Sequence, residues 1–246
     1  MSEREPASVS EARRARGSDS DATARAVVVI GAGGLGCPAL WELARVGRAD
    51  VRLVIVDDDV VDLSNLQRQI LHREADVGRP KVESARDALA RRFPKVQVSV
   101  RRERAGAANV RAIVSGAAVV LDGTDSFGAK FLINDACVAE GVPLVHGAVV
   151  GWGGQLMSVT GGSACFRCLF EAPPPEGSVA SCEQAGIIGA VAGVIGARMA
   201  EEALAILDGT PRLAGALDVW DARSLERRTV RIKPRAGCEA HMREVA

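Results

Sequence analysis

The chain has 246 residues, and its 31 Lys and Arg residues balance its 31 Asp and Glu residues, so the formal net charge at pH 7 is zero. Such a chain has no overall field that would draw it onto nucleic acid or an anionic membrane, and we expect neither as a partner. The most apolar stretch, residues 185–197, is shorter than the roughly 20 residues of a spanning helix, and the N-terminus lacks a secretory signal, so we expect a cytoplasmic protein.

The N-terminal residues differ in composition from the rest of the chain. Residues 1–24 mix Ser, Glu, Asp, Arg and Ala with almost no large apolar side chains, so they cannot offset the entropy of ordering. We therefore predict a disordered leader over residues 1–24. The remaining length suits one large α/β domain, and we expect a single domain over residues 25–246.

Buried strands and amphipathic helices alternate through the first half of this domain. An apolar run at 26–30 ends in glycines, a helical pattern follows at 38–46, and a second buried run covers 51–56. Further strands are expected at 96–100, 117–121 and 144–150, with helices at 81–92, 107–115 and 127–140. This alternation predicts a Rossmann-like, doubly wound, mostly parallel sheet.

The pattern changes after residue 155, where strands follow one another without intervening helices. A Pro/Gly/Ser loop covers 171–181, a long small-residue helix is expected at 186–207, and residues 217–220 and 228–232 suit a closing hairpin. The parallel sheet should therefore continue into a mixed or antiparallel C-terminal part. We expect the long helix to lie in the core, with a dimer interface as the alternative.

A glycine-rich loop joins the first strand to the first helix, where bare backbone amides and a helix N-terminus can bind phosphate oxygens. Its glycines are Gly31, Gly33, Gly34 and Gly36. Asp57 ends the second strand, at the position from which a carboxylate can accept hydrogen bonds from ribose hydroxyls. These residues predict a nucleotide site, and they fit an NAD-dependent oxidoreductase as well as they fit an ATP-using enzyme.

A polar run after Asp57 favours ATP. Arg68 and Lys81 can neutralise charge as pyrophosphate leaves, and Asn65 can hold a phosphate oxygen, whereas hydride transfer has no obvious use for them. Asp125 follows the fourth strand, at the edge where ligands bind in such sheets, and is the candidate Mg²⁺ ligand. The structural alternative is that Asn65 and Asp125 only cap helices and that the two cations are solvated.

From about residue 26 to residue 241 the chain resembles the molybdopterin-synthase and thiamine-pathway sulfur-carrier adenylyltransferases, relatives of the ubiquitin-activating enzymes. The resemblance rests on motifs that occur in one order. They are the double-glycine loop, Asp57-x-Asp59, Ser64-Asn65-Leu66-x-Arg68-Gln69, the Gly-x-Pro-Lys81 turn, Asp122-x-x-Asp125 and the cysteine pairs.

The resemblance implies that the chain uses ATP and Mg²⁺ to adenylate the C-terminal carboxylate of a small ubiquitin-like sulfur carrier ending in Gly-Gly, with release of pyrophosphate. It also implies a homodimer. The implied ATP site comprises Gly31, Gly33, Gly34, Gly36, Asp57, Asp59, Ser64, Asn65, Gln67, Arg68, Lys81, Asp125 and Ser126. The N-terminal half would bind ATP, and the C-terminal half would bind the carrier.

Two Cys-rich pairs have the two-residue spacing that lets neighbouring side chains hold one tetrahedral Zn²⁺. They are Cys165 with Cys168 and Cys238 with His241. Relatives usually carry cysteine at the fourth position, so His241 is a departure, although imidazole is an ordinary zinc ligand. The alternative is a redox-active or idle Cys165/Cys168 pair beside an unrelated histidine.

Cys182 follows a Pro/Gly-rich stretch and precedes the long helix, where a lowered pKa would make it a nucleophile. In the family this is the position of a cysteine that takes the activated carrier covalently, although some members do not depend on it. Cys37 and Cys137 fall in helix patterns and should be buried packing residues.

Three features depart from the family pattern. The arginine-containing N-terminal helix of relatives is not recognisable, Ser126 stands in place of an asparagine, and Lys130 stands in place of an arginine. Serine and lysine cannot reproduce the amide's reach or the guanidinium's fork. A third hypothesis is therefore a non-catalytic member that only binds a carrier. No partner is predicted for His72 or His146.

Overall fold

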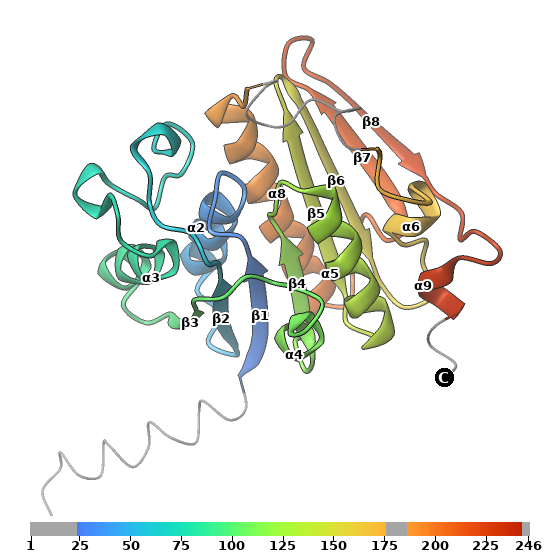
Figure 1. Ribbon diagram of the computed structural model, residues 1–246, viewed down its shortest axis with the longest axis horizontal. Helices are drawn as coiled ribbons and strands as arrows, with labels where there is room; N and C mark the ends of the chain where they lie inside the picture. The colour runs from blue at the N-terminus through green and yellow to red at the C-terminus, as the bar shows by residue number, and fades with distance from the viewer. Residues whose placement is uncertain (1–23, 176–185, 243–246) are drawn as a thin grey trace, which may run out of the picture.

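The computed structural model describes residues 24–175 and 186–242. One eight-stranded sheet runs through them in the order β3-β2-β1-β4-β5-β6-β7-β8 (Figure 1). Its strands are β1 (Arg25–Ile30), β2 (Val51–Val56), β3 (Gln97–Arg101), β4 (Val119–Asp122), β5 (Leu144–Val150), β6 (Gly153–Val159), β7 (Ala216–Asp221) and β8 (Glu226–Arg231).

Helices and short 3-10 turns connect these strands. The helices are α2 (Gly36–Val46), α3 (Lys81–Arg92), α4 (Val110–Val114), α5 (Phe127–Ala139), α6 (Phe166–Leu169), α8 (Gly189–Leu207) and α9 (Glu239–Met242). Two 3-10 turns, η1 (Leu63–Asn65) and η2 (Glu74–Asp76), lie between β2 and α3. None of the helices in the described part of the chain is both long enough and apolar enough for a bilayer crossing.

The sheet changes from parallel to antiparallel at β5. Strands β3, β2, β1, β4 and β5 pair in parallel, and β6, β7 and β8 continue the sheet antiparallel. Parallel neighbours need helical crossovers, whereas antiparallel ones can be joined by turns, which matches the change of pattern in the sequence. The predicted fold class is confirmed.

Alternate residues of each buried strand pack on opposite faces of the sheet, as the period of two requires. Val27 and Val29 join a core cluster with α2, α3 and α8, whereas Val28 and Ile30 join a cluster with α4 and α5. Figure 1 shows these helices on the two faces of the sheet. Because helices cover both faces of the sheet, the sequences of its buried strands are continuous apolar runs.

Helix α8 packs in the core because small residues let it approach its neighbours closely. A Cβ at Gly196 would lie 2.4 Å from Pro38 Cγ of α2, and one at Gly147 of β5 would lie 2.3 Å from Met199 Sδ of α8. Ile195 and Met199 are fully buried. The expectation of a core helix is therefore correct for this face, while Val194 on the same helix remains 41% exposed.

The predicted boundaries of β2, β5 and α3 are those found in the structure, and the boundaries of the other elements differ by a few residues. Helix α4 covers residues 110–114 rather than 107–115, because the Asn109 side chain accepts a hydrogen bond from the Gly106 N–H at 2.8 Å and holds a loop there. Helix α8 begins at Gly189 rather than at residue 186.

Candidate nucleotide site and cysteine-histidine centre

Strands β2, β1 and β4 of the parallel half end in one row, which places several loops at the same sheet edge. Val56 of β2, Ile30 of β1, Asp122 of β4 and His146 of β5 are register partners in succession. The residues that follow β2, β1 and β4 therefore leave the sheet side by side. Carboxyl edges of this kind are where open α/β sheets bind ligands.

The glycine loop leaves β1 at this edge and is fixed by Asp57. The Ala32 N–H donates to Asp57 Oδ2 at 2.7 Å, and the Asp59 N–H donates to Oδ1 at 2.8 Å. Burial raises the pKa of Asp57, opposed by these two hydrogen bonds and by the charge of Lys81. Gly31 has φ of 95°, and a Cβ there would lie 3.0 Å from the Gly123 carbonyl oxygen, so the loop requires glycine at this position.

Backbone donors in the loop remain available. None of the described residues accepts a hydrogen bond from the backbone N–H of Gly33 or Gly34. Free amides that precede the N-terminus of α2 suit an anion such as phosphate. The loop therefore offers donors rather than a closed turn.

Arg68 and Gln69 lie against the glycine loop. A Cβ at Gly34 would lie 3.3 Å from Arg68 Cγ, and one at Gly33 would lie 3.8 Å from Gln69 Nε2. An Arg68 Nη2 group donates to Asn65 Oδ1 at 2.5 Å. Gln69 is 3% exposed, and its Oε1 has no hydrogen-bond partner within the described residues. The polar run after β2 thus folds back over the glycines.

Lys81 begins α3 and reaches back toward the same edge. Its backbone N–H donates to the Asp59 carbonyl at 2.9 Å, and its Nζ lies 2.8 Å from Asp59 Oδ2. The lysine side chain is 9% exposed, whereas that of Asp59 is 66% exposed. The ammonium group is therefore held near Asp57 by a carboxylate that water can screen.

Neither Asn65 nor Asp125 acts as a helix cap, although the sequence left that role open for both. Asp62 accepts the hydrogen bond at the start of η1, from the Ser64 N–H at 2.8 Å, and the Ser64 hydroxyl also donates to it. Ser126 caps α5 by accepting from the Ala129 N–H at 3.2 Å. Asp125 is exposed at the mouth of the β4–α5 turn, and Gln67 is exposed beside α8.

A buried charged network supports the β4–α5 turn. Asp122 Oδ2 lies 3.1 Å from Lys130 Nζ and 2.8 Å from His146 Nδ1, while Oδ1 accepts from the N–H and hydroxyl of Thr124. Burial by itself raises the pKa of Asp122, but Lys130 and the hydrogen bonds hold it well below its usual range. Lys130 also donates to the Gly147 carbonyl at 2.7 Å. Lys130 therefore links the end of β4 to β5 next to the β4–α5 turn.

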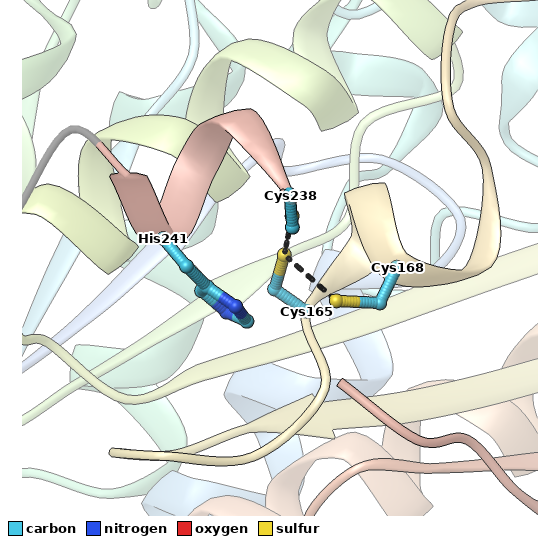
Figure 2. Close-up of side chains that lie close together, drawn as sticks. All are labelled: Cys165, Cys168, Cys238 and His241. Atoms are coloured by element: carbon cyan, nitrogen blue, oxygen red, sulfur yellow. Dashed lines mark hydrogen bonds between the residues drawn. The ribbon is translucent and has the colours of Figure 1, made fainter. Parts of the chain in front are cut away.

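Four potential metal ligands converge at the far side of the antiparallel half. The ligand atoms of Cys165, Cys168, Cys238 and His241 all lie within 4.8 Å of one another (Figure 2). Cys165 Sγ is 3.9 Å from Cys168 Sγ and 3.6 Å from Cys238 Sγ. Sulfurs at the corners of a tetrahedral Zn²⁺ site with ordinary bond lengths would be separated by about 3.8 Å. The donor set and its spacing fit zinc.

Two tethers hold this centre against the rest of the chain. The Phe166 N–H donates to Asn134 Oδ1 of α5 at 2.9 Å, and Arg167 makes two hydrogen bonds to Asp135, at 2.7 and 2.9 Å. Burial raises the pKa of Cys165 to about 12, and a bound cation would oppose this shift by stabilising the thiolate. For Cys168 burial acts in the same direction, but the Arg235 N–H and other hydrogen bonds lower its pKa.

Residues 15–240 of the chain match the ThiF family. The chain belongs to the ThiF family. It is 43% identical over 213 residues to the SAMP-activating enzyme E1 of Haloferax volcanii, covering 86% of this chain and 78% of that one. It is 40% identical over 214 residues to the sulfur carrier protein ThiS adenylyltransferase of Escherichia coli K12, covering 86% and 84%.

Solved structures agree with this membership at the level of the fold. A crystal structure of E. coli MccB with ATP superposes with a TM-score of 0.76 at 19% identity, covering 91% of this chain and 69% of that one. The chain spans about half the length of other curated relatives that it matches. Membership of the ThiF family confirms the predicted family and favours ATP over the NAD-dependent alternative.

The tertiary structure also reveals polar residues of this ThiF-family site that the sequence analysis did not assign. Gln69 was only part of a motif, and His72 and His146 had no predicted partner. His72 contacts the glycine loop from behind, and His146 binds Asp122. The available signal was the adjacency of Gln69 and His72 to Arg68. Cys182, the candidate nucleophile, lies outside the described residues.

Proposed function

We propose that this chain adenylates the C-terminal glycine carboxylate of a small ubiquitin-like sulfur carrier; its relatives are named an activating enzyme E1 and a sulfur carrier protein adenylyltransferase. The observation that carries the proposal is the placement of Arg68 against Gly34, beside free loop amides and close to Asp57. A guanidinium and backbone donors on one side of a ribose-binding carboxylate suit a triphosphate.

The reaction needs alignment and charge stabilisation rather than a covalent enzyme intermediate. A carrier carboxylate oxygen attacks the α-phosphorus, a P–O bond forms, and the bond to the departing pyrophosphate breaks with its electron pair. Negative charge then spreads over the phosphate oxygens, where Arg68, Lys81 and the amides of Gly33 and Gly34 can stabilise it. Asn65 orients Arg68 through the 2.5 Å hydrogen bond.

Other residues of the site would hold the nucleotide and its metal. Asp57 would accept from the ribose, and Asp125 would bind Mg²⁺, which neutralises phosphate charge when bound. Asp59 holds Lys81 before ATP arrives, and its exposed carboxylate can release the lysine at modest cost because water screens the pair. The remaining residues of the proposed ATP site line the carboxyl edge of the sheet; they are Ser64, Gln67, Ser126 and the loop glycines.

The Cys/His centre would bind Zn²⁺ through Cys165, Cys168, Cys238 and His241. The metal would act structurally, since four protein ligands leave no open position for chemistry. It would tie the C-terminal tail to the loop after β6, in the half of the domain that we propose receives the carrier. A homodimer, a cytoplasmic location and covalent capture by Cys182 remain further parts of the proposal.

The direct test combines the chain, ATP, Mg²⁺ and a carrier ending in Gly-Gly. Mass spectrometry of the carrier should show the addition of one AMP, and pyrophosphate exchange into ATP should depend on the carrier. Failure of every such carrier to react, while ATP binds, would contradict the proposal and favour a non-catalytic binding role.

Two variants test the cationic residues in this assay. Arg68→Ala and Lys81→Ala should each slow carrier-dependent exchange by about 100-fold to 1,000-fold, the loss typical of one transition-state donor. Arg91→Ala and Lys95→Ala are matched controls, because both side chains are exposed at the far end of α3 or just beyond it. The controls should retain full activity, and equal losses in all four variants would contradict the assignment.

A further inference from the structure

A buried histidine connects the back of the glycine loop to the helix that carries Lys81. His72 is 6% exposed, its Nε2 lies 3.0 Å from the Ala32 carbonyl oxygen, and its Nδ1 lies 2.9 Å from the Ser84 hydroxyl of α3. Ser84 is 1% exposed. Both ring nitrogens therefore make specific contacts in the core, although the ring lies outside the proposed set of nucleotide ligands.

The chemistry of these contacts determines the tautomer. A carbonyl oxygen can only accept, so Nε2 must carry the proton that bonds Ala32. In a neutral ring Nδ1 then accepts from the Ser84 hydroxyl, which also lies beside Asp76. Burial lowers the pKa of His72, which keeps the ring neutral at physiological pH. The Ala32 carbonyl also accepts from Cys37 Sγ at 3.2 Å.

Holding this carbonyl determines where the next amide points. The C=O of Ala32 and the N–H of Gly33 belong to one planar trans peptide, in which the two bonds point in opposite directions. His72 and Cys37 draw the oxygen into the core, so the Gly33 N–H is turned away from the core. None of the described residues accepts from that N–H.

We propose that His72 is a positioning residue for nucleotide binding: its Nε2–H holds the Ala32 carbonyl and thereby presents the Gly33 amide to the phosphates of ATP. This inference rests on the proposed function, since it assumes that the loop binds phosphate. The ring also links the loop to Ser84, which lies three residues after Lys81 on one helical face. The amide and the ammonium would therefore keep a constant separation at the phosphates.

The test measures binding of ATP with Mg²⁺, and of adenosine, by calorimetry on the full chain without carrier. His72→Gln places an amide nitrogen the same number of bonds from Cβ as Nε2, so it can still donate to Ala32. His72→Asn can reach Ser84 but not Ala32, and His72→Phe fills the space without any donor. The three variants therefore separate the Ala32 contact from the Ser84 contact and from packing.

We expect His72→Gln to bind ATP within about threefold of wild type, and His72→Asn and His72→Phe to bind about tenfold more weakly or worse, because a donor to a charged group is misplaced. Adenosine has no phosphate, so its affinity should change less than about twofold in all three. Thermal unfolding identifies any variant that fails to fold. If His72→Phe fails to fold, the ATP affinities of His72→Asn and His72→Gln still test the inference.

Three outcomes would overturn the inference. They are wild-type ATP affinity in His72→Asn, an equal loss of ATP and adenosine affinity, and no recovery in His72→Gln. A wild-type chain that binds ATP but adenylates no carrier would contradict only the proposed function. A wild-type chain that binds no ATP would contradict both.

Discussion

The nucleotide edge and the Cys/His centre are built in different ways. At the edge, the parallel strands end in register at Val56, Ile30 and Asp122, so backbone geometry brings the loops together before any ligand binds. At the centre, Cys165 and Cys238 are 73 residues apart and meet only as sulfurs, 3.6 Å from each other. The loops of the edge are held by the sheet, whereas the ligands of the proposed zinc site come from distant segments that a bound cation would link.

This difference predicts that loss of a proposed metal ligand should cost stability, while loss of a loop side chain at the edge should cost chemistry. The buried network of Asp122 and Lys130 beneath those loops is the exception, because its loss should also cost stability. Loss of a metal is among the few changes that exceed the usual destabilisation of a point mutation. Loss of a loop contact or a cation near phosphate should instead leave the fold intact. The variants below test how far the two regions are independent.

The largest effect is expected from Cys238→Ala. The thiol is 1% exposed and is one of the proposed zinc ligands, so the variant should lose bound zinc and about 4 kcal/mol or more of unfolding free energy. Elemental analysis and thermal unfolding measure the two quantities. Cys137→Ala is the matched control, since that cysteine is equally buried but lies outside the cluster, and it should keep its zinc.

A folded Cys238→Ala protein should still bind ATP at low temperature. Loss of ATP binding in a protein that remains folded would show that the two regions are coupled. Retention of zinc at the wild-type ratio would show that Cys238 is not a ligand.

The next largest effect is expected from Asp122→Asn. This change leaves the buried Lys130 ammonium without its carboxylate, which should cost about 3 kcal/mol of unfolding free energy without loss of zinc. Because the folded state lowers the pKa of Asp122, its contribution is complete above the unfolded value of about 4 and is lost as pH falls through the lower folded value.

Denaturant titrations from pH 7 to pH 3 test this dependence. The stability gap between wild type and Asp122→Asn should be constant near neutrality and should narrow below about pH 4. A gap that widens on acidification would contradict the assigned charge state. Asp135→Asn, in helix α5, is a control that should show a smaller gap, because the side chains of Asp135 and Arg167 are each 16% exposed whereas that of Asp122 is fully buried.

The smallest effect is expected from His241→Cys. Thiolate and imidazole are both ordinary zinc ligands, and His241 lies at the partly exposed end of the cluster. Zinc content should be unchanged, and the free energy of unfolding should shift by less than about 1 kcal/mol. His241→Ala should lower zinc affinity measurably in a chelator competition. Equal zinc affinity in the alanine variant would exclude the histidine from the centre.

Much of the fold follows from local patterns in the chain. The apolar runs at 51–56 and 144–150 and the helical pattern at 81–92 have the boundaries found in the structure, because strongly periodic, buried segments leave little choice of conformation. The Asn109 side chain, which accepts from the Gly106 N–H, accounts for the later start of α4, whereas the start of the long helix at Gly189 involves no side-chain cap. Hydrophobic periodicity does not predict such helix ends, because they depend on individual contacts near the end of the element.

The sequence by itself determined the order of the main elements, the family, the glycine loop with Asp57, and the two pairs that make up the Cys/His set, because each depends on residue types within short segments. That the two pairs meet, although Cys165 and Cys238 are 73 residues apart, depends on the tertiary structure. Only the tertiary structure decided what Asp122, Lys130, His72 and Gln69 contact. Their partners come from other strands and helices, and a buried polar group takes whichever donor or acceptor the packing brings within reach. Register between distant strands, rather than spacing along the chain, assembles that part of the site.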